Sequence, residues 1–485
     1  MDWRIKPLDD ILANAERKAL RRSLGPFQLM MLGVGAIIGT GIFVLTAVGA
    51  ERAGPGLLLS FVIAGVVCGF AALAYAELAS MVPVAGSAYT YSYAVMGELI
   101  AWVVGWNLIL EYAVAASAVA VGWSGYMNGL LGSWGVHIPQ TFTAGYFDLK
   151  SGAAGAGAGV MNLLAISAVI VVAALLVRGT RESAAVNTVL VVVKLVALAV
   201  FIVIAIPNIN FDNFSPFMPY GFLSREVFDV QLNAEVSKGV MAAAALIFFA
   251  YVGFDAVSTA AEETRDPNRN VPIGLIGSLA ICTVIYLLVA AGTVGTMPTE
   301  ELKNSKEPLA EVLRNLGFIR TGDLIGIAAV LALPTVIMMM LFGQIRIFFA
   351  MSRDNLLPAS LSAVHPRYAT PWIMTIITAV LVALVAGFFS VDEIAELSNT
   401  GTLLAFISVA AGVMVLRVTD PARKRSFRCP AVWAVAPLAI FGCLFLLASV
   451  PPKSLIRFGI WNVIGVAVYY LYSYSRSPMA KRLKV

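Results

Sequence analysis

The chain has 485 residues, of which 60% are hydrophobic and 13% are charged, with a formal net charge of +5. The charged share is roughly half of that in a typical soluble domain, so too few polar side chains exist to cover a water-soluble core of this size. Basic residues stand at the ends of apolar runs, which argues against nucleic-acid binding and indicates a membrane protein.

Apolar runs of about 20 residues, the length that a membrane-spanning helix needs, recur along nearly the whole chain. They predict an all-α integral membrane protein. We expect twelve transmembrane helices, near residues 27–50, 55–82, 97–129, 160–178, 184–206, 239–261, 272–296, 322–351, 372–390, 393–416, 432–450 and 455–475.

Lys and Arg are unevenly distributed between the two sides of such a bundle. If residues 1–26 are cytoplasmic, the cytoplasmic segments hold 22 of them and the opposite side holds ten. Because positive residues accumulate in the cytoplasm, both termini are expected inside, in a multi-pass protein of the cell membrane. Residues 1–26 fit an amphipathic helix on the anionic membrane surface, although a disordered positive tail fits as well.

Four glycines interrupt the first predicted helix: Gly33, Gly35, Gly39 and Gly41. Each interior glycine weakens a helix by about 1 kcal/mol relative to alanine, so we expect an unwound segment in mid-membrane. Such a segment bares backbone groups and is tolerated only around a cavity or a ligand. Bare N–H groups attract a carboxylate and bare carbonyls attract an ammonium, which suits an α-amino acid. Close helix packing through small residues is the alternative.

The sixth predicted helix is interrupted by Gly253 and the acidic Asp255. Paired breaks in corresponding helices mark the binding site between the inverted repeats of a transporter, so we predict a 5+5 inverted-repeat fold with discontinuous helices 1 and 6. We expect a cytoplasmic N-terminal amphipathic segment (1–26), the first repeat (27–206) and an extracellular loop (207–238). The second repeat (239–416), two extra helices (432–475) and a cytoplasmic tail (476–485) follow.

Several ordered motifs resemble those of one transporter family. The run Ile37-Ile38-Gly39-Thr40-Gly41-Ile42-Phe43 is similar to the helix 1 signature of the amino acid–polyamine–organocation superfamily. Residues 83–93, 105–112, 249–255, 262–263 and 268–272 resemble its cationic amino acid transporter family, in a prokaryotic-type member. The resemblance covers about residues 25–475. It implies the fold of the sodium-coupled neurotransmitter transporters (LeuT-like), and amino acid transport by alternating access.

The resemblance also implies roles for matching residues. Thr40 and Gly41, which follow Ile38 and Gly39 in the same stretch, would offer N–H groups to the substrate carboxylate. Carbonyl groups for the α-ammonium would come from both broken helices, at Ile37, Phe249, Ala250 and Val252. Phe249 would also cover the substrate, unless it is an ordinary packing aromatic.

Lys194 lies near the middle of the fifth predicted helix. A lysine at the bilayer centre costs about 2.5–3.5 kcal/mol on insertion scales, so a compensating role is expected. In proton-coupled relatives a lysine of helix 5 stands where sodium-coupled members hold a sodium ion and bridges helices 1 and 8. We therefore expect proton-coupled symport, with H⁺ as coupling ion and no metal or organic cofactor. A permanently charged strut and sodium coupling are the alternatives.

Two carboxylates fall inside apolar runs. Glu111, on a helix face with Ala115, is a candidate for holding the substrate ammonium, or else for a structural bond to a neighbouring helix. Asp255 is a further candidate, and we expect it chiefly to cap the N–H groups freed by the break. At the end of helix 6, Glu262 and Glu263 are candidates to pair with Arg21 or Arg22 as an inner gate, the alternative being a solvated loop.

A cationic substrate needs an acceptor for its distal charge, and beyond Glu111 and Asp255 none is evident. Met339 on helix 8 is chosen instead as a contact to the side chain, so we expect small neutral L-amino acids such as alanine. Cationic amino acids are the main alternative. A membrane-embedded enzyme is remote, because the histidines His137 and His365 lie in predicted loops, and a channel would need a charged ring or filter. The expected partners are the amino acid substrate and the lipid bilayer. The sequence does not determine whether a small accessory membrane subunit also binds.

Overall fold

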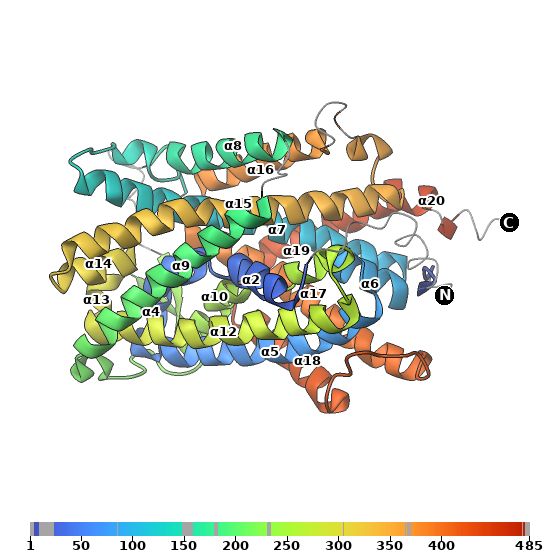
Figure 1. The fold of residues 1–485 in the computed structure, drawn as a ribbon, viewed down its shortest axis with the longest axis horizontal. Helices are drawn as coiled ribbons and strands as arrows, with labels where there is room; N and C mark the ends of the chain where they lie inside the picture. The colour runs from blue at the N-terminus through green and yellow to red at the C-terminus, as the bar shows by residue number, and fades with distance from the viewer. Residues whose placement is uncertain are drawn as a thin grey trace.

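The computed structural model describes residues 4–8, 24–84, 86–147, 159–178, 183–229, 234–303, 305–363, 365, 370–477 and 479–480. These residues form one bundle whose longest helices run along the long axis of the molecule (Figure 1). Within them, eight helical stretches are long and apolar enough to cross a membrane, and four other apolar helices are shorter.

Among the described residues, the first half of the chain contains eight α-helices. They are α2 (Pro26–Ile37), α3 (Thr40–Phe43), α4 (Leu45–Ala53), α5 (Leu57–Met81), α6 (Ser87–Val95), α7 (Glu98–Ser133), α8 (Leu163–Arg178) and α9 (Ser183–Ala205). The strands β1 (Arg225–Asp229) and β2 (Ala234–Lys238) follow and pair antiparallel, with Val227 opposite Val236.

The second half begins with α10 (Val240–Ile247), the 3₁₀ turn η6 (Phe248–Tyr251) and α11 (Ala256–Thr259). It continues with α12 (Pro267–Thr296), α13 (Thr299–Leu302), α14 (Pro308–Asn315), α15 (Ile319–Arg353), α16 (Trp372–Phe388), α17 (Val391–Thr419), α18 (Val432–Ala448), α19 (Pro452–Val468), a π-helical turn (Tyr469–Ser473) and α20 (Tyr474–Arg476). Short 3₁₀ turns stand at Gly54–Gly56, Gln140–Phe142, Ile206–Asn208, Phe211–Phe214, Ala261–Glu263 and Ala359–Ser362.

Each of the twelve predicted ranges contains helix, and the breaks in the first and sixth are confirmed. The number of membrane crossings and the inverted repeat stay predictions. The sequence missed α6, where buried tyrosines rather than aliphatic residues face the core. It also missed α13 and α14, and the β1–β2 hairpin within the loop predicted at 207–238 is a departure from the all-α expectation.

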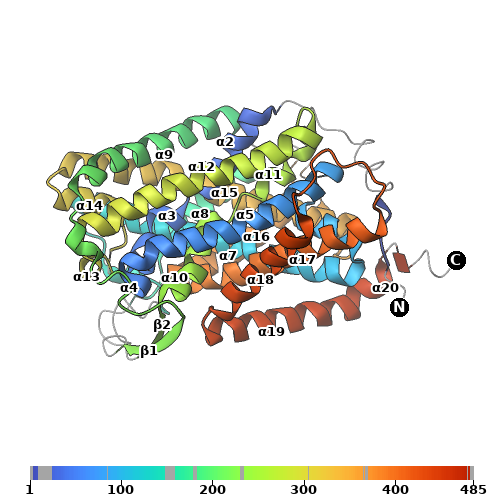
Figure 2. The same cartoon turned by 90° about the horizontal axis from the view of Figure 1, so that it is seen from below.

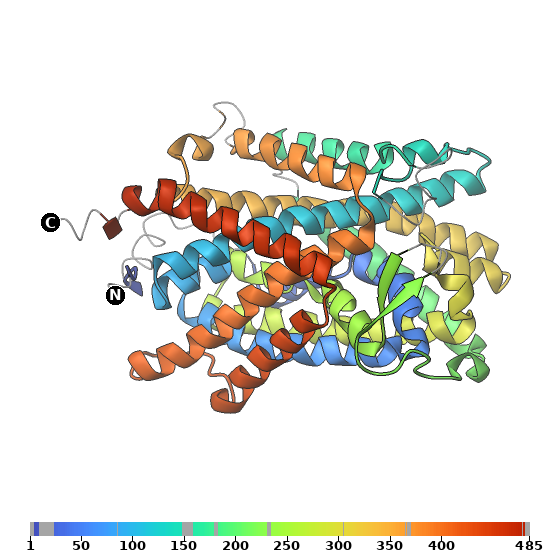
Figure 3. The same ribbon diagram turned by 180° about the vertical axis from the view of Figure 1, so that it is seen from behind.

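The long α7 lies at the centre of the bundle, packed against α15 and α17, while α5 packs against α12 and α10. α10 and α11 are buried along their whole length. α10 packs against α5 and α4, and α11 packs against α2 and α12 (Figure 2). Seen from behind, α19, in red, lies across α7 (Figure 3). The two broken helices are therefore enclosed by protein, where bare backbone groups are tolerated.

The two ends of the bundle are distinguished by what they carry. At one end, here called the inner face, the Arg4 guanidinium contacts Glu98 at 3.2 Å and the Lys6 ammonium contacts Asp354 at 2.7 Å. The opposite, outer face carries the β1–β2 hairpin, α13 and α14. Residues 4–7 have no regular secondary structure, and Leu8 is helical. Residues 9–23 lie outside the described part.

Candidate functional site: two helix breaks around a small cavity

The first helix is broken between α2 and α3. Ile38 and Gly39 leave the helical conformation, with ψ angles of 94° and −149°. The carbonyls of the last turn of α2 are thereby released from intrahelical bonds, and Thr40 and Gly41 fall in the first turn of α3, where N–H groups have no intrahelical acceptor. The break thus bares acceptors on one side and donors on the other, in the arrangement expected from the sequence.

The sixth helix is broken by a left-handed glycine. After the 3₁₀ turn η6, Val252 is extended, and Gly253 has a φ angle of +115° before α11 begins. A Cβ atom on Gly253 would lie 3.0 Å from the backbone of Ala36, so this position also needs the small residue for packing. The two breaks therefore lie against each other.

The closest approach joins α3 to η6. A Cβ atom on Gly41 would stand 2.3 Å from the Cα of Ala250, a distance that real Cβ atoms do not adopt. On the other side of α3, Gly122 of α7 faces the Thr40 side chain, and a Cβ there would lie 2.7 Å from the Thr40 hydroxyl. That hydroxyl is buried without a hydrogen-bond partner among the described residues. Thr40 thus presents an unused polar atom beside the bare N–H groups.

A small cavity separates the breaks from α7 and α15. Its volume is about 10 Å³, which is room for about one water molecule. The lining is apolar apart from backbone groups and Thr40, and is made by Ala36, Ile37, Gly39, Thr40, Gly41, Ala115, Val119, Phe249, Val252, Val336 and Met340. Seven of these were predicted as substrate contacts. The structure therefore represents a closed form that has to expand before it could hold an amino acid.

Lys194 of α9 holds the end of α2 from outside the cavity. Its fully buried ammonium donates to the carbonyl of Gly35 at 2.9 Å and to that of Ile38 at 3.1 Å. The family resemblance implies that this lysine bridges helices 1 and 8. Lys194 contacts helix 1 through these two bonds, and within the described residues it forms no hydrogen bond to α15, which is the predicted helix 8. Lys194 and the cavity thus lie on opposite sides of the same released turn.

Tyr286 of α12 connects the two breaks, and sequence reasoning missed it. Its buried hydroxyl lies 2.8 Å from the carbonyl oxygen of Ile37 and 2.9 Å from that of Ala250. A phenol has one proton to donate, so the two carbonyls share it. Both carbonyls had been predicted to bind the substrate ammonium, and in this closed form Tyr286 takes that place.

The two intramembrane carboxylates do not line the cavity. Glu111 points from α7 toward α17, close to Gly401, and neither of its carboxylate oxygens has a hydrogen-bond partner among the described residues. Asp255 stands at the N-cap of α11, but its side chain forms no cap bond and instead accepts a hydrogen bond from the Tyr112 hydroxyl at 3.0 Å. The capping role of Asp255 stays a prediction, and the structure adds Tyr112 as a partner of its carboxylate.

The methionine that reaches the cavity is Met340, not Met339. Met340 is buried and lines the cavity, whereas Met339 is partly exposed and lines none of it. Successive residues of an α-helix point about 100° apart, so only one of the two can face the breaks. In this structure the methionine at the cavity is therefore Met340, one position after the predicted Met339.

Of the predicted inner gate, the structure describes the surroundings of Glu263 alone, and the pairing with Arg21 or Arg22 stays a prediction. Glu263 forms an ion pair with Arg346 of α15 at 2.8 Å, and Arg346 also donates to the Thr259 carbonyl. Arg21, Arg22 and the side chain of Glu262 lie outside the described residues. Beside this pair, Leu24 bridges to the chain around Thr264 through two backbone hydrogen bonds, of 3.0 and 2.8 Å. The inner side of the breaks is thus closed by α2, α11 and α15 together.

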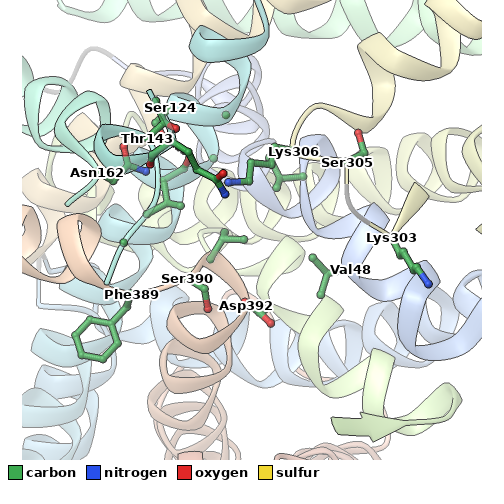
Figure 4. Close-up of a pocket in the computed structure, with 17 residues that line it drawn as sticks. Val48, Ser124, Thr143, Asn162, Lys303, Ser305, Lys306, Phe389, Ser390 and Asp392 are labelled. Atoms are coloured by element: carbon green, nitrogen blue, oxygen red, sulfur yellow. Dashed lines mark hydrogen bonds between the residues drawn. The ribbon is translucent and has the colours of Figure 1, made fainter. Parts of the chain in front are cut away.

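A wider pocket lies on the outer side of the breaks. It has a volume of about 270 Å³, and its lining includes Val44, which follows α3, and Gly122 of α7. Figure 4 shows the polar side chains that line it. Lys303, Ser305 and Lys306 enter it from the link between α13 and α14, and Asp392 enters from the start of α17. We call it the outer vestibule. Gly122 of its lining lies against Thr40 of the cavity, so the two spaces are neighbours.

The sequence matches the amino acid permease family model over residues 24–471. The chain belongs to the amino acid permease family. It is 44% identical to a branched-chain amino acid permease and 42% identical to a methylthioribose transporter, both of Bacillus subtilis, with 98% and 99% of each chain covered. A cationic amino acid transporter of Arabidopsis thaliana is 37% identical over 94% of this chain and 74% of its own.

These relatives place the chain in the amino acid–polyamine–organocation superfamily, close to the cationic amino acid transporters, as the motifs indicated. The permease is thus a multi-pass membrane transporter of amino acids and not an enzyme.

Proposed function

We propose that this permease is a proton-coupled symporter of neutral L-amino acids with small apolar side chains, such as alanine, working by alternating access in the cell membrane with both termini in the cytoplasm. The observation that carries the proposal is the meeting of two helix breaks at Gly41 and Ala250. N–H groups of α3 and carbonyls of the two breaks suit the two charges of an amino acid, and Thr40, Ile37 and Phe249 line one cavity.

The wall of the cavity supports a neutral side chain. Val119, Val336 and Met340 are apolar, and no carboxylate is among the lining residues. A lysine or arginine substrate would bury its distal charge without a partner, which is costly. The names of the relatives widen the range, since one is a branched-chain amino acid permease. We therefore include valine-sized side chains as candidates.

Methylthioribose is a second candidate, favoured by the 42% identity to its transporter. It carries no ammonium and no carboxylate, so the bare backbone groups at the breaks would bind hydroxyls instead. The same apolar wall would then hold its methylthio group. The two candidate substrates therefore differ in charge at the helix breaks, because an amino acid would present an ammonium and a carboxylate there and methylthioribose would present uncharged hydroxyls.

Proton coupling is proposed from the position of Lys194. Its ammonium holds two carbonyls of the released turn, at Gly35 and Ile38. Because burial disfavours the charged form of a lysine, loss of its proton would loosen this turn of α2, whose movement opens the inner side. A sodium ion would compete with the ammonium for the same carbonyls.

The test is uptake into proteoliposomes of the purified protein, with proton and sodium gradients imposed separately. Labelled alanine, valine, arginine and methylthioribose are compared at equal concentration. We expect alanine or valine uptake that an inward proton gradient stimulates and a sodium gradient does not. Preference for arginine or methylthioribose would overturn the substrate proposal, and gradient-independent accumulation would overturn the coupling.

A further inference from the structure

A groove runs along the outside of the bundle, far from the helix breaks, between α8 and α16. Figure 1 shows these two helices side by side at the upper edge of the molecule, with α15 and α7 below them. The groove has a volume of about 590 Å³. It opens outward, because Ile170 and Val380 on its two walls are 58% and 53% exposed. In a membrane protein, this surface faces lipid.

Small residues create the groove. Alanines occupy positions on both walls, including Ala174 of α8 and Ala383 of α16, and they leave room where leucine or isoleucine would close the gap. At its far end the helices come together, since a Cβ atom on Gly387 would lie 2.8 Å from the Ile166 side chain. The groove is therefore a pocket with one closed end rather than a furrow along the whole membrane.

The other end of the groove carries its one charged lining residue, Arg178, the last residue of α8. Thr370, which precedes α16, donates to the carbonyl of Val177 there. This end lies at the inner face, because α16 follows the end of α15 where Asp354 meets Lys6. An exposed guanidinium at the membrane surface attracts anionic headgroups.

The length of the groove fits one leaflet. From Ile166 to Arg178 the helix rises about 18 Å, at about 1.5 Å per residue, and half of a bilayer core is about 15 Å. A transmembrane helix of a partner protein would need about 30 Å of apolar surface. The depth and the single positive end therefore suit a lipid chain better than a helix.

We propose that the α8–α16 groove is a binding site for an anionic phospholipid, with one acyl chain between the helices and its phosphate beside Arg178. Phosphate pairs well with a guanidinium, which can donate two parallel hydrogen bonds. The site is separate from the transport cavity and does not depend on which solute the permease carries.

The experiment measures thermal unfolding of the purified full-length protein in detergent, titrated with dioleoylphosphatidylglycerol or with dioleoylphosphatidylcholine. The chains are the same in both, so the difference reports the headgroup. We expect phosphatidylglycerol to raise the midpoint at lower concentration. Arg178→Gln should weaken its apparent affinity about fivefold, as expected for one basic residue at a membrane surface.

Two further variants test the chain part of the site. Ala174→Phe and Ala383→Phe fill the groove from opposite walls, and Ala174 is exposed, so folding should be retained. Both should lower the response to either lipid. Arg269→Gln, at an exposed arginine of α12, is the matched charge control and should behave as the unmodified protein. Equal responses to the two lipids, or an unchanged preference in Arg178→Gln, would overturn the proposal, as would equal stabilisation by glycerol phosphate alone.

Discussion

Gly41 and Ala250 touch through their backbones, so that a Cβ atom on Gly41 would stand 2.3 Å from the Cα of Ala250. This contact joins the unwound part of the first helix to that of the sixth. The relationship explains why a helix-weakening residue stands at mid-membrane. The glycine that interrupts the helix is also the one that lets its partner approach.

Gly41→Ala is therefore expected to separate the two breaks and to abolish uptake, because the new methyl group would overlap the Cα and Cβ of Ala250, which no side-chain rotation can move. Initial uptake rates in proteoliposomes check this, normalised to the folded protein recovered. Gly69→Ala is the control, since nothing lies within 4 Å of a Cβ there. It should keep full uptake and gain up to about 1 kcal/mol of helix stability. Full uptake by Gly41→Ala would contradict the proposed site.

Tyr286→Phe should destabilise the protein and impair uptake. The substitution removes the hydroxyl shared by the Ile37 and Ala250 carbonyls, and an unsatisfied buried acceptor costs about 1–3 kcal/mol. Unfolding midpoints and the KM for the substrate measure the two effects. In the control Tyr251→Phe, the lost hydroxyl donates to Phe61 inside α5, where the carbonyl also serves the helix. Equal losses in the two variants would mean that the bridge between the breaks has no special role.

The helix breaks could be predicted from the sequence because their signal is local. Four glycines within nine residues weaken a helix wherever it lies. Gly253 adopts a positive φ angle, which glycine permits whatever its neighbours are. Tyr286 gives no such signal. It is one of several tyrosines in apolar runs, and its partners Ile37 and Ala250 are distant in sequence. Only the packing of α12 onto both breaks selects it.

The other differences between the predicted and the observed site also arise from contacts between residues distant in sequence. Whether Met339 or Met340 faces the cavity depends on the rotation of α15 about its axis. Because α15 has apolar residues on several sides, the sequence does not determine that rotation. The partner of Glu263 depends on which basic residue the fold brings near, and Arg346 lies inside a predicted helix. Asp255 has the residue type and place of a cap, yet Tyr112 binds its carboxylate. Residue type predicts what a side chain can do, and tertiary packing decides its partner.

Met340→Ala should enlarge the cavity and shift uptake toward larger side chains. Met340 lines the cavity beside Val336, and changes of a methylene or two in an apolar pocket are worth about tenfold or more in selectivity. We expect the ratio of leucine to alanine uptake to rise about tenfold. Met339→Ala, one position away and partly exposed, should leave the ratio unchanged. If both variants alter the ratio equally, the assignment of Met340 to the substrate wall is wrong.

Reversal of the ion pair at the inner face tests whether it helps to close that side. Arg346→Glu and Glu263→Arg each place like charges together where the structure has a 2.8 Å ion pair. Each should lower the uptake rate, modestly, because partly exposed pairs contribute about 0–1 kcal/mol. The double exchange should restore part of the rate, and not all, since Arg346 also donates to Thr259. No recovery in the double variant would show that the charges act independently.

Lys194→Met removes the ammonium that holds the Gly35 and Ile38 carbonyls while keeping a long side chain. If proton exchange at Lys194 drives the movement of α2, stimulation of uptake by an inward proton gradient should disappear in this variant. Substrate binding should persist, because Lys194 lies outside the cavity lining, and a substrate-induced rise in the unfolding midpoint measures it. Lys238→Met is the control, since Lys238 stands over the Tyr220 ring in the loop region. Proton stimulation that survives in Lys194→Met would exclude this lysine as the coupling group, whatever the substrate proves to be.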